Sequence, residues 1–276
     1  MNKLLNKKII VDNYSIESAS LYENNINKNF LYGQETKKFI NNLTIKNKDK
    51  VIADIGCGTG YVFELINKKY KNNNIKFYGI DPAEGMLNIA KKKINDKKTL
   101  FKKGYFEKIP LKTNSVDKII STFALHWVAS IDKALKELKR ITKNNCSIDI
   151  LMVEKNDGKE FKKIVFKIMK KYLSKKQIFN AANLINRLTK NELKKKISYH
   201  FNLKNEYSLF LKKKEKIVYG SCNDHLKWWK ARSLQFISEV KNKKLFIENL
   251  KEELNKYKDK KIPFDLSLLE IHIVKE

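Results

Sequence analysis

Two periodicities of hydrophobic and polar positions alternate along residues 50–154. Short apolar runs are separated by longer stretches in which apolar residues recur every three or four positions, a pattern typical of strands alternating with helices. We expect strands at 50–55, 75–80, 99–103, 116–121 and 146–153. The helix expected at 131–143 carries an apolar stripe that should face a sheet, formed by Ile131, Ala134, Leu135, Leu138 and Ile141. The connections are long enough for right-handed crossovers, so the pattern predicts an α/β fold with a doubly wound parallel sheet.

The segments on either side of this core follow other patterns. Residues 1–48 are polar with helical spacing, and we expect them to form an N-terminal helical cap before a main domain at 49–276. The Lys-rich stretch 157–199 is amphipathic and could touch a membrane or an acidic partner, although such helices more often cover a sheet. Beyond it we expect a sixth strand at 199–212, helices at 224–242 and 244–257, and a closing strand at 265–275. Residues 157–199 and 221–258 would then be helical additions that form a lid.

A glycine-rich turn after the first strand carries the clearest chemical signal. Asp54 precedes three alternating glycines, Gly56, Gly58 and Gly60, and a helical run follows them. Backbone N–H groups and a helix dipole can approach a ligand closely at such a turn, because glycine has no Cβ. A dinucleotide site would need glycine where Tyr61 stands, and a phosphate-binding P-loop would need Lys followed by Ser or Thr after Gly60. A tight turn without a ligand is the structural alternative.

The second expected strand also ends in an acid, Asp81, about 20 residues beyond the glycine turn. A carboxylate at this distance is the expected partner of a ribose diol, because it can accept two charge-assisted hydrogen bonds. The glycine turn and this acid together favour a nucleoside-containing ligand at the carboxyl ends of the first two strands.

Four segments, taken in order, resemble the motifs of class I S-adenosylmethionine-dependent methyltransferases of the type-11 kind. They are D-x-G-x-G-x-G at 54–60 and the stretches at 81–90, 104–111 and 114–121. The resemblance covers about the first 155 residues and implies S-adenosyl-L-methionine as the cofactor. It further implies a Rossmann-like, doubly wound, seven-stranded and mostly parallel sheet with an antiparallel last strand, plus a helical lid.

The same resemblance implies a set of cofactor-binding residues. They are Asp54, Gly56, Cys57, Gly58, Gly60, Asp81, Pro82, Met86, Phe106, Glu107, Thr122 and Phe123. One position departs from the family pattern, since Tyr105 stands where an Asp usually accepts a hydrogen bond from the adenine amino group. We therefore expect the backbone of Phe106 and the side chain of Glu107 to border the adenine.

Residues 121–128, with the sequence Ser-Thr-Phe-Ala-Leu-His-Trp-Val, resemble the matching run of methyltransferases that act on free or carrier-bound carboxylates. The likeness implies His126 as a catalytic base or as a hydrogen-bond donor to the acceptor, and Trp127 as part of the substrate pocket. Tyr22 and Gln34 resemble the opening segment of small-molecule methyltransferases and would bind the substrate. Ordinary structural packing is the alternative for all four residues. The implied activity is methyl transfer to a small or acyl-carrier-protein-bound acceptor, at a carboxylate oxygen.

The net charge changes this picture only slightly. The chain has 59 Lys and Arg against 30 Asp and Glu, a formal charge of +29, which favours non-specific RNA affinity. Only Arg140, Arg187 and Arg232 are arginines, however, and proteins that grip phosphate favour the two-pronged hydrogen bonding of Arg. Codon usage that replaces Arg by Lys over the whole surface explains the charge without selection for polyanion binding.

Two alternatives stay open at this point: an RNA methyltransferase that uses the basic surface, and a non-catalytic cofactor-binding partner subunit. Amino-directed nucleic-acid enzymes carry [D/N]-P-P-[Y/F] after the fourth strand, where this chain has Thr-Phe-Ala-Leu at 122–125. Pyrimidine C5 enzymes need a nucleophilic Cys, and Cys146 lies at the start of the fifth strand, where it does not fit. Tyr105 is the feature that favours a non-catalytic subunit.

The remaining chemistry-bearing residues suggest no further site. The cysteines stand singly and are odd in number, which argues against a disulfide framework, and they are Cys57, Cys146 and Cys222. Surface or strand positions are expected for His200, His225 and His272, and no metal site is expected. The sequence contains no 18-residue apolar run and no secretory leader pattern, so we expect no membrane span and a cytoplasmic location.

Overall fold

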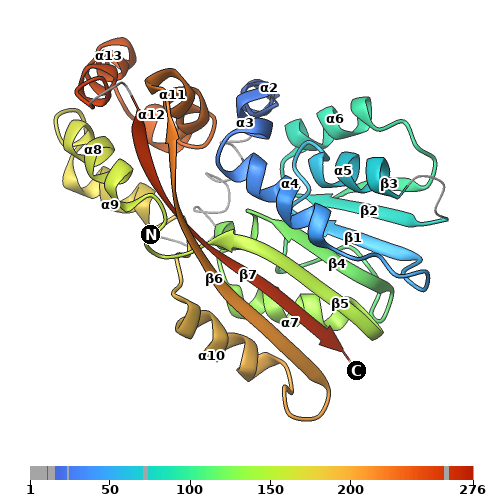
Figure 1. Ribbon diagram of the computed structural model, residues 1–276. Coiled ribbons are helices and arrows are strands. Elements are labelled where there is room, and N and C mark those ends of the chain that lie inside the picture. Colours follow the sequence, from blue (N-terminus) through green and yellow to red (C-terminus); the bar gives the residue numbers. More distant parts are fainter. Residues whose placement is uncertain (1–10, 12–15, 24, 71–73, 258–260, 276) are drawn as a thin grey trace.

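The computed structural model describes residues 11, 16–23, 25–70, 74–257 and 261–275 around one seven-stranded sheet (Figure 1). The strands are β1 Val51–Ile55, β2 Lys76–Asp81, β3 Thr99–Lys103, β4 Val116–Thr122, β5 Thr142–Val153, β6 Tyr207–Gly220 and β7 Ile262–Lys275. Their order is β3-β2-β1-β4-β5-β7-β6, and β7 pairs antiparallel with both β5 and β6, whereas the other pairs are parallel. The expected doubly wound, mostly parallel sheet with an antiparallel last strand is therefore confirmed.

Helices precede, connect and follow these strands. Those before β5 are α2 Ile16–Tyr22, α3 Asn25–Asn29, α4 Tyr32–Asn42, α5 Tyr61–Lys69, α6 Glu84–Lys93, the 3-10 turn η1 Leu125–Trp127 and α7 Ile131–Ile141. Those after β5 are α8 Lys159–Met169, α9 Lys175–Ala182, α10 Lys190–His200, α11 Cys222–Lys230, α12 Leu234–Ile237 and α13 Lys243–Leu254. The stretch 1–48, expected to form a cap, contains the helices α2 to α4, while residues 1–10, 12–15 and 24 lie outside the described residues.

Alternate residues of β1 send their side chains into two separate cores, as the period of a strand requires. Ile52 belongs to a cluster with Phe39 of α4 and Phe63 of α5, while Ile55 belongs to a cluster with Leu135 of α7. Every residue of the apolar stripe expected on α7 is buried, and Ser130 caps the helix by accepting a hydrogen bond from the N–H of Lys133. The sheet is thus covered on both faces.

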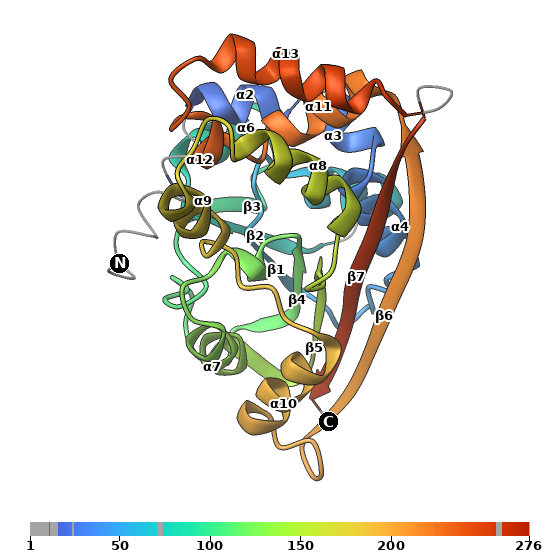
Figure 2. The same cartoon turned by 90° about the vertical axis from the view of Figure 1, so that its left-hand side faces the viewer.

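The helices α8, α9 and α11 to α13 gather beyond the carboxyl ends of the parallel strands, whereas α10 lies apart and packs against α7 and β6 (Figures 1 and 2). α8 packs against β7 and α13, and α11 packs against α3 and α13, so segments far apart in sequence share one hydrophobic cluster. β7 begins within this group and then runs along the whole sheet. β7 therefore connects the helical lid to the sheet as one continuous strand.

Several expected element boundaries differ from the structure. The sixth strand was expected at 199–212, but Tyr199 and His200 finish α10, and β6 runs from Tyr207 to Gly220 in register with β7. The Lys-rich helical stretch expected at 157–199 consists of three helices, because Ser174 and Thr189 each begin a new one with a capping box.

The elements after β6 also differ in detail. The helix expected at 224–242 stops at Lys230 and resumes briefly as α12, and β7 starts three residues before the expected strand. His225 was expected at a surface or strand position, and this was wrong: it is fully buried on α11 against Phe30 and Phe161. Helical spacing places it on the inner face of α11, beside Leu226 and Trp229.

A buried ionic ladder crosses three central strands. Lys118 on β4 lies 2.6 Å from Asp149 on β5, and Asp149 lies 2.6 Å from His272 on β7. Lys118 and Asp149 are each only 4% exposed. The hydrogen bonds to His272 and Lys118 hold the pKa of the Asp149 carboxyl below its usual range despite burial, which alone would raise it. A lysine is tolerated in this central strand because an acid on the neighbouring strand, two residues beyond the position that pairs with it, compensates its charge.

Within the described ranges, no helix has the length and apolar character that crossing a bilayer requires.

Candidate cofactor and acceptor site

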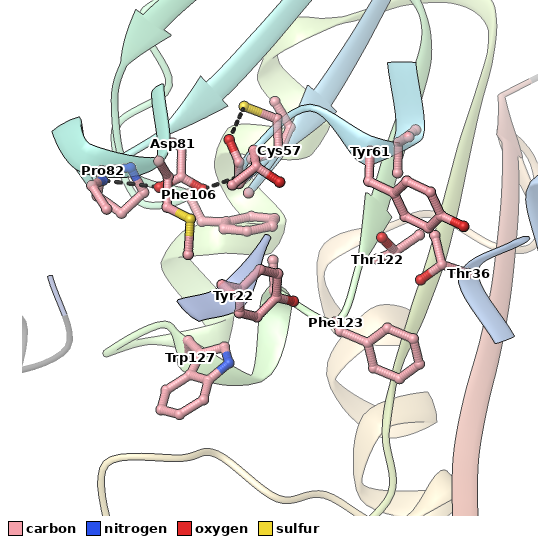
Figure 3. A pocket seen from close by; sticks show the side chains of 18 of the residues that line it. Tyr22, Thr36, Cys57, Tyr61, Asp81, Pro82, Phe106, Thr122, Phe123 and Trp127 are labelled. Carbon is pink, nitrogen blue, oxygen red and sulfur yellow. Dashed lines mark hydrogen bonds between the residues drawn. The ribbon is translucent and has the colours of Figure 1, made fainter. Parts of the chain in front are cut away.

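One cleft opens at the carboxyl ends of β1, β2 and β4 (Figure 3). It encloses about 1270 Å³, its open mouth included, and its walls come from the loops after these strands, from α2 to α4, and from Arg232 after α11. Ligands of doubly wound sheets bind at this edge, where the strand order reverses. Here β1 is the switch point, since the chain runs outward to β2 and β3 on one side and to β4 and β5 on the other.

The glycine turn forms the floor of the cleft, and each glycine is needed for a different reason. Gly56 has φ +78°, and an added Cβ would lie 2.2 Å from the Cβ of Ala124. Gly58 has φ +52° with no heavy atom within 4 Å of an added Cβ, so its backbone is open for close approach. Gly60 does not line the cleft, and an added Cβ would lie 2.5 Å from Ile94 beyond α6. Gly60 therefore serves packing rather than ligand contact.

Asp81 holds the glycine turn and lines the cleft at the same time. Its two carboxylate oxygens each accept a hydrogen bond of 2.9 Å, one from the N–H of Gly58 and the other from the N–H of Ala83. Burial raises the pKa of Asp81 to about 6, and the two N–H bonds oppose this rise. Each oxygen has a second lone pair, so the carboxylate can still accept from a ligand diol.

Asp54 lies behind the turn and is 1% exposed. Neither of its carboxylate oxygens has a hydrogen-bond partner among the described residues, and burial together with the nearby Asp81 raises its pKa well above the usual range. Burying a carboxylate without a hydrogen-bond donor costs free energy, and a cationic ligand close to the carboxylate would offset that cost. S-adenosyl-L-methionine is positively charged at its sulfonium and amino groups, so the acids of this site fit it.

The residues expected around adenine gather at one end of the cleft. Figure 3 shows Asp81, Pro82 and Phe106 together there, and Met86 and Glu107 also line the wall. Glu107 accepts hydrogen bonds of 2.8 Å and 3.3 Å from the N–H groups of Ala129 and Ser130. Glu107 thus fixes the segment after η1, in addition to bordering the cleft as expected.

The end of β4 reaches the opposite part of the cleft. Thr122 and Phe123 line it, and Phe123 adopts a left-handed backbone conformation with φ +53°, which is unusual for a bulky residue. Its N–H donates to the carbonyl of Leu151 on β5 at 2.7 Å, and its ring stacks on Tyr32 with centroids 4.4 Å apart. These contacts stabilise the strained turn and place an aromatic wall where the cofactor's methyl group is expected.

The expected substrate-binding residues divide into two groups. Tyr22 and Trp127 line the cleft and point into it in Figure 3. Gln34 is exposed on α4 and lies outside the lining, because the residues of α4 that face the cleft are Tyr32, Gly33 and Thr36. The structure therefore gives Gln34 no contact with a bound substrate.

His126 also lies outside the lining, contrary to the role expected for it. The side chain is 4% exposed within the turn η1, and its Nδ1 has no hydrogen-bond partner among the described residues. Burial, followed by the charges of Arg187, Arg232 and Lys162, lowers its pKa to about 3. An imidazole in this setting stays neutral and is a weak base, so the catalytic role expected for His126 has no geometric support.

Sequence reasoning missed two residues that shape the cleft, Tyr32 and Arg232. The hydroxyl of Tyr32 donates to Asp157, a buried acid just before α8, and this bond joins the N-terminal cap to the lid. Arg232 lies over the rings of Tyr22, Tyr32 and Trp228. The sequence signal that could have singled out Arg232 was the rarity of arginine, because only three of the 59 basic residues are Arg.

The fold and this site define a class of protein. A switch point at β1, a glycine turn, a ribose-type acid after β2 and an antiparallel last strand are together those of S-adenosylmethionine-dependent methyltransferases, whose cofactor is S-adenosyl-L-methionine. More particularly, residues 53–148 match the family model described as a methyltransferase domain. The chain thus carries a methyltransferase domain, as its motifs indicated.

Curated relatives match over the same region. The ubiquinone/menaquinone biosynthesis C-methyltransferase of Campylobacter jejuni is 34% identical over 113 residues, 40% of this chain and 47% of that protein. The malonyl-[acyl-carrier protein] O-methyltransferase of Priestia megaterium is 33% identical over 92 residues, 33% of this chain and 32% of that protein. The chain spans about half or less of the length of these relatives.

Solved structures match over most of the chain. YcgJ of Bacillus subtilis has a TM-score of 0.59 at 15% identity, covering 88% of this chain and 99% of that one. Phosphoethanolamine N-methyltransferase 2 of Haemonchus contortus, solved with S-adenosyl-L-methionine, has a TM-score of 0.57 at 12% identity, covering 95% and 56%. At these identities the comparison shows a shared fold.

Proposed function

We propose that this protein transfers the methyl group of S-adenosyl-L-methionine to a small or carrier-bound acceptor, at a carboxylate oxygen. The observation that carries the proposal is the single cleft that combines both halves of the site. The glycine turn and Asp81 line its cofactor end, with Asp54 buried behind the turn, and the aromatic side chains of Tyr22 and Phe123 line it from α2 and from the end of β4.

When bound, S-adenosyl-L-methionine supplies a methyl carbon activated by its positive sulfur. The protein's own contribution is to orient the acceptor and to exclude water, which can be worth several kcal/mol of the barrier. Tyr22, Phe123 and Trp127 supply apolar surface for this purpose. An acceptor oxygen that is already anionic would attack the methyl carbon with its lone pair and displace the sulfur, so the protein would not have to remove a proton.

The choice of a carboxylate rests on the shortage of a base. The described lining holds no histidine, and burial raises the pKa of the Cys57 thiol well above its usual range. The lining acids are engaged: Asp81 and Glu107 accept backbone N–H groups, and Glu23 lies 2.6 Å from Lys28. A carboxylic acid has a pKa of about 4 in water and so needs no base at neutral pH, unlike a hydroxyl or a carbon acid.

The named relatives bear on the acceptor in different ways. The malonyl-carrier-protein enzyme acts on oxygen, in keeping with the proposal, and the C-methyltransferase of Campylobacter acts on carbon, which would require a base.

Two alternative functions have less support. An RNA acceptor rests on the net charge alone. A non-catalytic subunit rests on Tyr105, which lines the cleft where an acid was expected.

The test is to incubate the protein with methyl-labelled S-adenosyl-L-methionine and fractionated cell extract, and then to treat each labelled fraction with mild base. The proposal expects label in a small-molecule or carrier-protein fraction, released by base as volatile methanol. Asp81→Ala protein is the control and should leave the fractions unlabelled. Base-stable label in any fraction, RNA included, would contradict carboxylate methylation, and cofactor binding without any transfer would identify a non-catalytic subunit.

A further inference from the structure

Among the described residues, one guanidinium in the cleft has no acid partner. The described part of the lining contains two cations, Lys28 and Arg232. Lys28 is already neutralised, because it lies 2.6 Å from Glu23 and 3.4 Å from Glu64. Arg232 forms no ion pair with any described residue, so its charge is available to something in the cleft.

The surroundings of Arg232 fix its position without using all of its donors. Its guanidinium carbon lies 4.7 Å from the centre of the Tyr22 ring, 5.1 Å from Trp228 and 5.5 Å from Tyr32. Its Nη1 donates to the side-chain oxygen of Asn27 and, at 3.2 Å, to the carbonyl of Trp228. No described residue accepts from its Nε or Nη2, and these two atoms form one of the edges with which Arg binds two oxygens at once.

The place of Arg232 in the cleft assigns it to the acceptor rather than to the cofactor. Tyr32 links it to the methyl end, since the Tyr32 ring stacks on Phe123 next to Thr122 at the end of β4. The glycine turn and Asp81 lie at the other end (Figure 3). Arg187 and Lys162 are further cations near His126, and their charges, together with that of Arg232, lower the pKa of its imidazole in addition to burial.

The composition of the chain gives an independent reason to single out this residue. Three of 59 basic residues are Arg, and one of these, Arg140, uses its fork to bind Glu137 and two backbone carbonyls. Where a chain that otherwise uses Lys keeps Arg, the planar fork is the property that Lys cannot replace. Arg232 lines the cleft, and its Nε and Nη2 donate to no described residue.

We propose that Arg232 binds a carboxylate of the acceptor through its Nε and Nη2 edge, so that the acceptor is an acid with an apolar body seated among Tyr22, Tyr32 and Phe123. The inference rests on the proposed function and sharpens it, because it names the anchor that selects an acid over the matching amide or alcohol. Preorganisation by three aromatic rings and Asn27 lowers the conformational entropy lost when the acid binds.

The experiment measures binding of phenylacetate, phenylacetamide and phenyl phosphate to the protein saturated with S-adenosylhomocysteine, followed by tryptophan fluorescence and calorimetry. Phenylacetate should bind at least about tenfold more tightly than phenylacetamide, since only the acid forms charge-assisted hydrogen bonds. Arg232→Met should remove this preference, and Arg232→Lys should lose most of it because Lys lacks the fork. Lys230→Met, which removes one exposed charge from the adjoining end of α11, should bind phenylacetate as the unaltered protein does.

The outcomes separate this inference from the proposed function. Equal binding of acid and amide, an unchanged preference in both Arg232 variants, or a preference for phenyl phosphate would each overturn the carboxylate site. Normal S-adenosylhomocysteine binding in Arg232→Met would show that the cleft is intact, and Arg232→Lys keeps the test decisive if the Met variant loosens the Asn27 contact. Failure of the unaltered protein to bind S-adenosylhomocysteine would instead overturn the proposed function.

Discussion

The carboxylate of Asp81 shows how one side chain can shape a site and also bind in it. It bonds to the N–H groups of Gly58 and Ala83, and it faces the cleft where a ribose is expected. A charge-assisted hydrogen bond contributes about 1.5–3 kcal/mol, so we predict that Asp81→Ala weakens cofactor affinity by about tenfold to a hundredfold. Titration calorimetry checks this, and retained affinity would remove Asp81 from the binding site.

The same residue predicts a dependence of cofactor affinity on pH. The pKa of Asp81 is raised to about 6 in the free protein, and the ionised form is the better acceptor for a diol. Affinity should therefore be full above pH 6 and fall as the pH drops through 6, by at most about tenfold per pH unit. Calorimetry between pH 5 and 8 measures this, with Asp81→Asn as the control that should lose the dependence. A flat profile for the unaltered protein would count against the assignment.

For His126, in contrast to Asp81, we expect no direct part in binding or catalysis. Its side chain is buried outside the cleft, with a pKa lowered to about 3 by burial and by three nearby cations. We predict that His126→Gln changes thermal stability but leaves the turnover number at saturating cofactor within about twofold, with no inflection near pH 6.5 in either protein. A loss of turnover with unchanged cofactor affinity would restore the role expected from sequence.

Among the elements, β4 and β5 depend on a charge pair that neither strand could bury alone. Asp149 compensates Lys118 in the middle of the sheet, and removing one partner leaves an uncompensated buried charge. We predict that Asp149→Asn lowers the free energy of unfolding by about 3–5 kcal/mol in urea denaturation.

Two controls define this prediction. Replacing both partners, with Lys118→Met and Asp149→Leu, should recover much of the loss, because well-packed apolar side chains can substitute for a buried pair. Breaking the exposed pair between Lys163 and Glu160 with Glu160→Gln should cost less than about 1 kcal/mol. An Asp149→Asn protein as stable as the unaltered one would show that water reaches Lys118.

The elements also show how far sequence reasoning reaches. The strands that build the glycine turn and the apolar stripe of α7 follow from local periodicity, and the structure has them within a few residues. β6 does not, because its register comes from pairing with β7, more than 40 residues later, while its own sequence carries a charged run at 212–216 between two apolar segments. Tyr32 and Arg232 could not be placed in the cleft for the same reason, since tertiary packing brings α4 and α11 to it.

For the whole molecule, the charge of +29 predicts binding to RNA that is electrostatic and non-specific. If several phosphates are contacted, affinity should fall by about a thousandfold or more between 50 and 200 mM salt, with no preference among sequences. Filter binding of two unrelated RNAs over this salt range measures it. Binding that persists at high salt for one sequence would show selected recognition and revive the RNA methyltransferase alternative.

The placement of β7 between β5 and β6 has a consequence for how the protein is made. The only sheet neighbour of β6 within the described strands is β7, which leaves the ribosome later. Until then the apolar residues Phe210, Ile217 and Tyr219 lie on a strand with no partner, a form prone to pair with other chains. The intervening lysines, at 212, 213, 214 and 216, repel such pairing. The charge of this strand therefore protects the nascent chain while it waits for β7.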